Sequence, residues 1–507
     1  NEALNSIDWQ DLYEHRDGYL MFEDLKQQWK QFDGEGFDYV LIDSRTGHTD
    51  VGGICTRQLP DAVMVMFLPN DQNIDGLAPI ISGIRAENKD RNPKIAIEFC
   101  PSNVPDLDDE NDILSSQLKR AKKTLKFESE SSIINHYSSY DVLAQKAFVL
   151  ARPNSKLSKQ YEKLRSSIVA LNYDDPEGAR VALKRLPAEY ERARRESHTK
   201  AWGEVRNKTA DIRSRHPTDG EIAFLASRIL SEIGDSAGEI EALNAAIDLN
   251  YERNRAYLAR AFTYSSIGKQ EEAKADLRAV VASPDVSIFE LGPALQILQE
   301  IDRDWTEILG QVLRRADLDL STINALSTYA LSHREALRAV AEVSLERVNS
   351  GELENEALQV MRNNAVLALI ASRQFTRAIE YLERTSGESW GDFHLIDLFN
   401  YAMAKWGLEG APSLELFTHC LEKFAFAPER TSNALQCLAL AAGVVGDKDH
   451  AVNAISAALE RLQPGVIAFS CWTYLYSDAD EFRSDLGAMK VQIERNEPIK
   501  PLLFEVG

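Results

Sequence analysis

The sequence predicts an N-terminally incomplete α/β domain with a parallel sheet over residues 1–171 and an all-α superhelix of repeats over residues 218–507. A helical linker over residues 172–217 is expected between them. In the first part, apolar runs of strand length alternate with helix-like segments, which is typical of crossover connections in a parallel sheet. After residue 218 strand patterns disappear, and a helix–turn–helix unit recurs at a step of 34 residues.

The first domain is organised around residues 37–53, which read FDYVLIDSRTGHTDVGG. Four apolar residues that end at Asp43 favour a parallel strand buried on both faces. Asp43 then lies at the carboxyl end of the strand, where open α/β sheets bind their ligands. Taken alone, this pattern also fits an ordinary buried strand that ends in an aspartate-capped turn.

Two more buried strands are expected, over residues 62–69 and 94–101. The second strand should end in a loop around Asn70 and Gly76, and the third should close in a turn at residues 102–105. Helices are expected over residues 1–36 (with turns), 77–88, 113–127 and 156–171. The order of these elements predicts helices that cover a parallel sheet.

The run from Phe37 to Gly53, with its continuation ICTRQLPD to Asp61, resembles the Walker B and switch II segment of MinD/ParA-like P-loop ATPases. The resemblance extends from about residue 7 to about residue 170. It implies binding of ATP and Mg²⁺, with Asp43 positioning Mg²⁺ through water and the Gly47 amide sensing the γ-phosphate. It further implies a switch loop lined by Ser44, Arg45, Thr49 and Asp50.

By order along the chain, the resemblance also implies that a loop after the third strand packs against the nucleotide base. Its residues here are Pro101, Ser102, Asn103 and Val104. A simple proline-flanked turn explains these four residues equally well. The resemblance further implies that nucleotide binding promotes self-association through this domain, as a homodimer.

The lysine-bearing Walker A run of this family, KGG-x-G-[KR]-[ST], does not occur in the sequence. Without it no loop cradles the phosphates, so this chain alone is expected to lack ATPase activity. We expect that the run lies upstream of Asn1 in a longer protein. The alternative is a degenerate domain whose free sheet edge is covered by a partner.

In the second half, Gly234 and Gly268 lie 34 residues apart, as do Leu243 and Leu277. This step and the small residues Ser227, Ala261 and Ala273 resemble tetratricopeptide repeats. Gly268 should end its helix in a left-handed cap. Looser copies are expected over residues 360–385 and 432–460, with a terminal capping helix around Phe482, Leu486 and Met489. Repeat arrays present a groove that binds protein partners, or they act as rigid spacers.

The composition excludes several classes of function. A net charge of −22 argues against broad binding to nucleic acid. Five scattered cysteines indicate reduced thiols in a cytoplasm, and no apolar run approaches the length of a membrane span. Two functions stay open: an ATP-dependent regulatory switch coupled to a protein-binding array, in signalling or defence, and a non-catalytic scaffold. Motifs of a hydrolase or protease are missing from the sequence.

Overall fold

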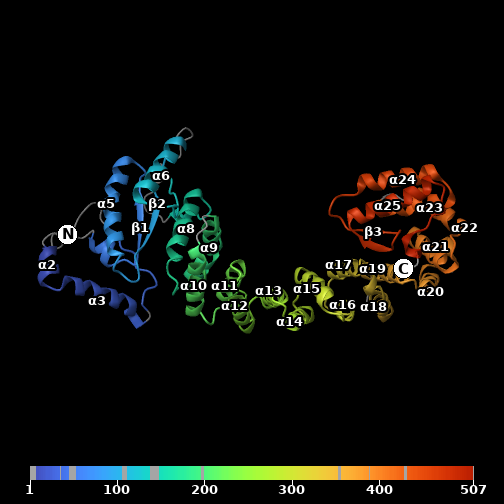
Figure 1. The fold of residues 1–507 in the computed structure, drawn as a ribbon, viewed down its shortest axis with the longest axis horizontal. Coiled ribbons are helices and arrows are strands. Elements are labelled where there is room, and N and C mark those ends of the chain that lie inside the picture. The colour runs from blue at the N-terminus through green and yellow to red at the C-terminus, as the bar shows by residue number, and fades with distance from the viewer. Residues whose placement is uncertain are drawn as a thin grey trace. The chain divides into compact units, whose positions relative to one another are not determined.

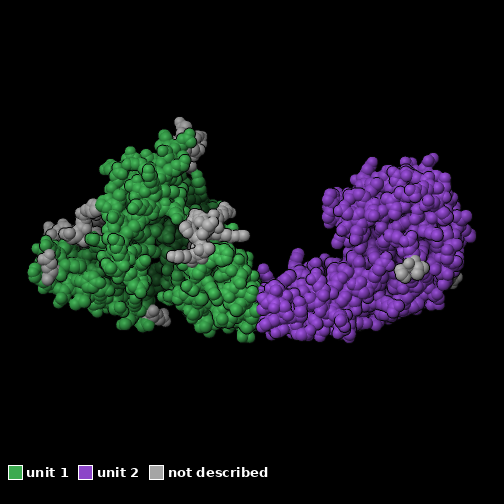
Figure 2. Space-filling view, viewed as in Figure 1, with its two compact units in different colours: residues 1–252 green, residues 253–507 purple. Residues whose placement is uncertain are grey.

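The computed structural model describes residues 7–34, 36–44, 53–105, 111–137, 148–195, 199–351, 355–387, 389–426 and 431–505, and these residues are mostly α-helical (Figure 1). The chain divides into two compact units, residues 1–252 and residues 253–507 (Figure 2). Each unit has hydrophobic clusters of its own.

The first unit combines one parallel strand pair with helices. Its elements are α2 (Trp9–His15), α3 (Gly18–Gln31), β1 (Ala62–Phe67), α5 (Asp71–Glu87), β2 (Ala96–Pro101), α6 (Asn111–Leu125), α7 (Phe148–Ala151), α8 (Lys156–Val169), α9 (Pro176–Arg195), α10 (Thr199–Arg215), α11 (Gly220–Glu232) and α12 (Ser236–Asp248). The second and third predicted strands and the predicted helices are therefore present. α5 begins earlier than expected because Asn70 caps its first turn.

The two strands pair in parallel, with Ala62 opposite Ala96 and Phe67 opposite Pro101. Side chains alternate between two apolar layers, as strand geometry requires. Val65, Phe67 and Phe99 pack in one cluster with apolar residues of α5 and α6. Met64 and Cys100 pack in another cluster with Leu157 and Leu164 of α8. The predicted burial of these two strands is therefore confirmed only in part, because Val65 and Phe67 of β1 and Phe99 and Cys100 of β2 are buried, whereas Met66 of β1 is 47% exposed.

The first predicted strand is wrong for the described residues. Residues 37–44 form no strand, and the side chain of Leu41 is 84% exposed. The segment is held instead by polar contacts to the turn before α9. The Tyr39 hydroxyl donates to a carboxylate oxygen of Asp175 at 2.6 Å, and the Asn172 amide donates to the Asp38 carbonyl at 3.2 Å. A strand needs a neighbouring strand for its backbone groups, and the strand pairs among the described residues do not include residues 37–44.

The expected linker over residues 172–217 forms two helices, α9 and α10, as the sequence indicated. Apolar residues of both helices contribute to a buried cluster. Ala182, Leu183 and Leu186 of α9 are buried, and they cluster with Val205 and Ile212 of α10. The helical period places these scattered residues on one stripe of each helix.

The second unit is a succession of packed helices with one small hairpin. Its elements are α13 (Arg253–Ser266), α14 (Gln270–Ala282), α15 (Ile288–Ile301), α16 (Trp305–Leu313), α17 (Leu320–Ala330), α18 (Leu337–Ser350), α19 (Asn355–Ala371), α20 (Phe375–Ser386), α21 (Leu395–Glu409), α22 (Leu414–Ala425), α23 (Ser432–Val445), α24 (Lys448–Arg461), β3 (Ala468–Ser470), β4 (Leu475–Ser477) and α25 (Ala479–Glu494). Consecutive helices pack as pairs, which is consistent with helical repeats.

Several features of the predicted repeats are present in this unit. Ala261 and Ala273 are fully buried, one on each helix of the α13–α14 pair. Gly268 follows α13 with φ +79°, a left-handed backbone that disfavours a side chain. The pairs α19–α20 and α23–α24 coincide with the two looser copies. The small residues thus occupy the places where paired helices approach each other.

The end of the array contains an element that the sequence did not reveal. β3 and β4 pair antiparallel, although no strand was expected after residue 218. Each strand has only three residues, so neither leaves a readable alternation. The predicted capping helix is confirmed as α25, in which Phe482, Leu486 and Met489 are fully buried.

Candidate functional site

The carboxyl ends of β1 and β2 form a continuous edge built by backbone hydrogen bonds. The Ser102 amide donates to the Phe67 carbonyl at 2.8 Å, which joins the two strand ends. On the other side of β2, residues 131–136 run alongside. Here the Ile134 amide donates to the Pro101 carbonyl at 2.9 Å and the His136 amide to the Val104 carbonyl at 2.7 Å. This edge is where ligands of open α/β sheets bind.

The four predicted base-contacting residues lie together at this edge but differ in exposure. Pro101 and Val104 are buried, and their carbonyls are used by residues 134 and 136. Ser102 is half-buried and Asn103 is exposed. Asn103 has φ +55°, and its side-chain oxygen lies 2.6 Å from Nδ1 of His136. Only Ser102 and Asn103 therefore present side chains to a ligand.

The N-terminus of α5 adds charge and backbone donors after β1. The Asn70 side chain accepts from the Asn73 amide at 2.9 Å and caps the helix. Arg120 of α6 pairs with Asp71 and binds Asp75 at 2.9 Å. A helix N-terminus attracts anions, but here two aspartates and an arginine already balance one another.

Of the six residues predicted for the switch, the structure describes Asp43 and Ser44. Asp43 is exposed and Ser44 is half-buried, at the end of the segment held by Asp175 and Asn172. The predicted residues Arg45, Gly47, Thr49 and Asp50 lie outside the described residues. The roles of all six residues therefore stay predictions.

Among the described residues, no group of three metal-ligating side chains is placed to hold a metal ion. A single carboxylate with water ligands is enough for Mg²⁺ in nucleotide sites, so Asp43 suits the expected ion as a hard oxygen donor. No helix in the described part of the chain has the length and apolarity to cross a membrane.

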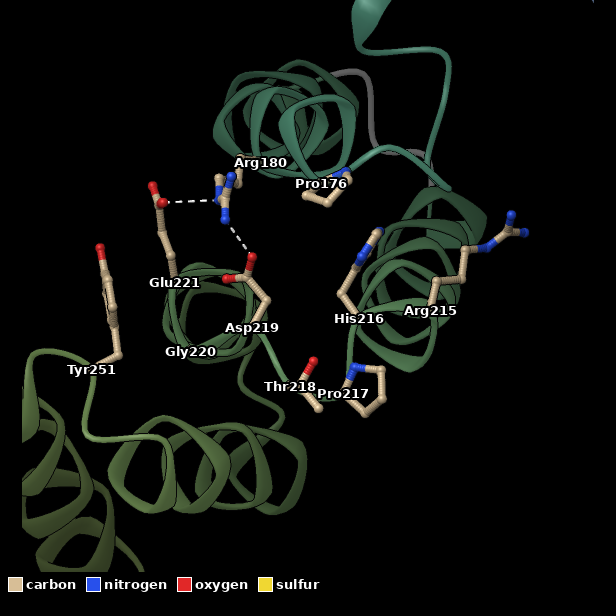
Figure 3. A pocket seen from close by; sticks show the side chains of 10 residues that line it. All are labelled: Pro176, Arg180, Arg215, His216, Pro217, Thr218, Asp219, Gly220, Glu221 and Tyr251. Carbon is tan, nitrogen blue, oxygen red and sulfur yellow. Dashed lines mark hydrogen bonds and ion pairs between the residues drawn. The ribbon is translucent and has the colours of Figure 1, made fainter. Parts of the chain in front are cut away.

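A hollow of about 410 Å³ lies within the first unit, where α9, α10 and α11 meet (Figure 3). Its arginines form ion pairs with carboxylates in the lining or next to it. Arg180 pairs with Asp219 and binds Glu221 at 2.9 Å, while Arg215 binds Asp174 at 2.7 Å. Sequence reasoning missed this hollow because its residues are divided between the predicted linker and the start of the predicted repeats. The only sequence signal was Asp219, whose carboxylate caps α11.

A polar cluster is buried near the end of the second unit. The Ser470 hydroxyl donates to Asp485 at 2.5 Å, and the Gln436 amide donates to the Ser470 hydroxyl at 3.1 Å. Burial raises the pKa of Asp485. Burial likewise raises the pKa of the Cys471 thiol, beside Cys437. These groups are enclosed by packing, which indicates a structural role.

A second hollow, of about 390 Å³, lies between the start of α23 and the segment that leads into β3. Its lining is largely apolar and uses Leu462, Val466 and Phe469. It brings together none of the predicted site residues.

Comparison with known proteins adds no family. The chain matches no protein-family model, and no curated protein resembles it at a significant level.

Proposed function

We propose that the protein is an ATP-dependent regulatory switch, in which a MinD/ParA-like nucleotide-binding part is coupled to a tetratricopeptide-like array that binds a protein partner. The observation that carries the proposal is the run from Phe37 to Asp61, which leads directly into β1. The same run supplies a carboxylate at position 43 and a glycine at position 47, the residue types that a magnesium-bound phosphate requires.

The parallel β1–β2 pair supports the proposal. Its carboxyl edge presents Ser102 and Asn103 directly after β2, where the resemblance expects the nucleotide base. In the switch that we propose, ATP and Mg²⁺ draw Asp43 and the loop after it toward this edge. The contacts of Tyr39 and Asn172 then have to give way, which couples nucleotide binding to the turn before α9.

The proposal is tested with the full natural protein, including any residues upstream of Asn1. We expect Mg²⁺-dependent ATP binding in calorimetry and a loss of about tenfold or more in affinity for Asp43→Ala, since a metal-positioning carboxylate typically contributes more than ~1.4 kcal/mol. Asp90→Ala, at an exposed turn, is the matched control and should bind as the wild type does.

An absence of Mg²⁺-dependent ATP binding in the full protein would end this proposal. A scaffold without nucleotide chemistry is the second candidate, and one observation favours it. The described segment around Asp43 is exposed and forms no strand, whereas the described helices of the second unit are packed around a large hydrophobic core. Under that function, Asp43→Ala leaves every binding property unchanged.

A further inference from the structure

Two helices at the start of the second unit expose the same positions of the repeat. On each helix three exposed residues are spaced by seven and then four positions, which places them on one face. These residues are Arg255, Phe262 and Ser266 on α13 and Phe289, Gln296 and Glu300 on α15; Arg253, the first residue of α13, is exposed as well. Each residue of the second set follows its counterpart by 34 positions, so the two stripes belong to one repeated face.

This face is apolar at its centre. Phe262 is 52% exposed and Phe289 is 86% exposed, although the unit has a large core in which aromatic side chains can be buried. Half-buried Leu258, Ala259 and Pro293 lie on the same sides of α13 and α15. Exposed aromatic residues with few charges between them are typical of the centre of a protein interface. We call these five residues the Phe262–Phe289 face.

The helices that carry this face are in contact. α13 packs against α15, and the Tyr329 hydroxyl of α17 donates to the Gln299 side chain of α15 at 2.6 Å. In Figure 1, α13, α15 and α17 follow one side of this stretch, and α14, α16 and α18 follow the other. All of these helices lie within the described residues and within one unit.

Positive charge borders the face at one end. α13 contains Arg253, Arg255 and Arg260 and no acidic residue, in a chain whose net charge is −22. Arg260 binds Asp276 of α14 at 2.6 Å, and Arg253 lies over the ring of Tyr257. Arg255 extends from the exposed stripe itself. A positive border on an otherwise acidic protein selects its partners by charge.

We propose that the Phe262–Phe289 face binds an acidic segment of a partner protein that carries large apolar side chains. This inference rests on the array half of the proposed function and names the chemistry of its partner. The apolar side chains of the segment pack on Phe262 and Phe289, while its carboxylates meet the arginines of α13. Because α13 contains three arginines and no acidic residue, it favours an acidic segment over a basic one at this face.

The test uses the whole chain, residues 1–507, without nucleotide. A random library of short peptides displayed on phage is selected against it, and the enriched peptides are measured by fluorescence anisotropy. We expect peptides rich in Asp or Glu together with Leu, Phe or Trp. The double variant Phe262→Ala, Phe289→Ala should bind them about tenfold more weakly or worse, as loss of interface anchors does.

Two matched controls separate this face from general effects. Phe426→Ala removes a phenylalanine that is 88% exposed elsewhere on the unit and should leave binding unchanged. Arg255→Glu should weaken binding of the acidic peptides, whereas Arg483→Glu, on α25, should not. All substituted side chains are exposed, so the variants should retain their helical circular dichroism spectrum.

Four results would overturn the inference. The first is enrichment of basic peptides, and the second is a selection that enriches no peptide. The third is equal peptide binding by the wild type and the double alanine variant. The fourth is binding of the protein to phosphatidylserine vesicles that is lost in the double alanine variant. The nucleotide proposal is judged separately. If the protein binds ATP but no peptide, only the proposal for this face is rejected. If it binds peptide but no ATP, only the proposal of a switch is rejected.

Discussion

Truncation of Phe482 to alanine is expected to lower the stability of the C-terminal part of the array by about 3–5 kcal/mol, the usual cost of emptying a fully buried phenylalanine site. Phe482 is fully buried on α25, the capping helix, and belongs to the large core of the second unit. α25 packs against α24 and β3. A cavity here therefore loosens the cap that covers the last helical pair.

Native-state hydrogen exchange measures this effect locally, because a protein of two units need not unfold in one step. Amides of α23, α24 and α25 should exchange faster in Phe482→Ala, and amides of the first unit should not change. Phe426→Ala is the matched control and should change stability by less than about 0.5 kcal/mol, since Phe426 is 88% exposed. Equal effects of the two substitutions would contradict the packing of the cap.

Substitution of Gly178 by alanine is expected to cost about 3 kcal/mol in the first unit, at the upper end of overpacking effects. A Cβ atom at this position would lie 2.0 Å from the Asn172 carbonyl oxygen and 2.5 Å from that of Val169. Both contacts are with backbone atoms, so no side chain can turn aside. α9 would have to move away from the end of α8.

Hydrogen exchange of α8 and α9 reports the displacement. Gly203→Ala, on α10, is the control, because a Cβ atom there meets nothing within 4 Å. That substitution should stabilise α10 by about 0.5–1 kcal/mol, the difference in helix propensity between glycine and alanine. Should Gly178→Ala leave exchange in α8 and α9 unaltered, the close approach of these two helices would be wrong.

The fold could be predicted where periodicity and burial agree. Val65 and Phe67 in β1, and Phe99 in β2, lie in apolar runs that are buried between helices, so their strands were found. Ala261 and Gly268 revealed the repeat because small residues and left-handed caps recur at fixed positions. Local pattern and tertiary packing require the same residues in these places.

The prediction was wrong where the secondary structure of a segment depends on its contacts with another part of the chain. Val40 and Ile42 lie in a run with strong strand character, yet the described segment has no pairing partner and is exposed. The β3–β4 hairpin is too short to leave a pattern, and its place is set by contacts with α23 and α25. A single sequence does not reveal which neighbour a segment will find.

The candidate site could be predicted only in part. Residues 101–104 were expected at the edge of the sheet and lie there, because the carboxyl end of β2 fixes their place. Which of them present side chains depends on residues 131–136, whose pairing alongside β2 was not expected. The apolar Phe262–Phe289 face was also not expected, since exposed phenylalanines look like core residues in the sequence.

The most direct test of the switch is amide hydrogen exchange of residues 37–44 in the full natural protein, with and without ATP and Mg²⁺. Without nucleotide these amides should exchange rapidly, because the segment is exposed and forms no strand. With ATP and Mg²⁺ the account predicts strong protection of this segment, and no protection in Asp43→Ala. Unchanged exchange in residues 37–44 with ATP and Mg²⁺ present at saturating concentrations would contradict it.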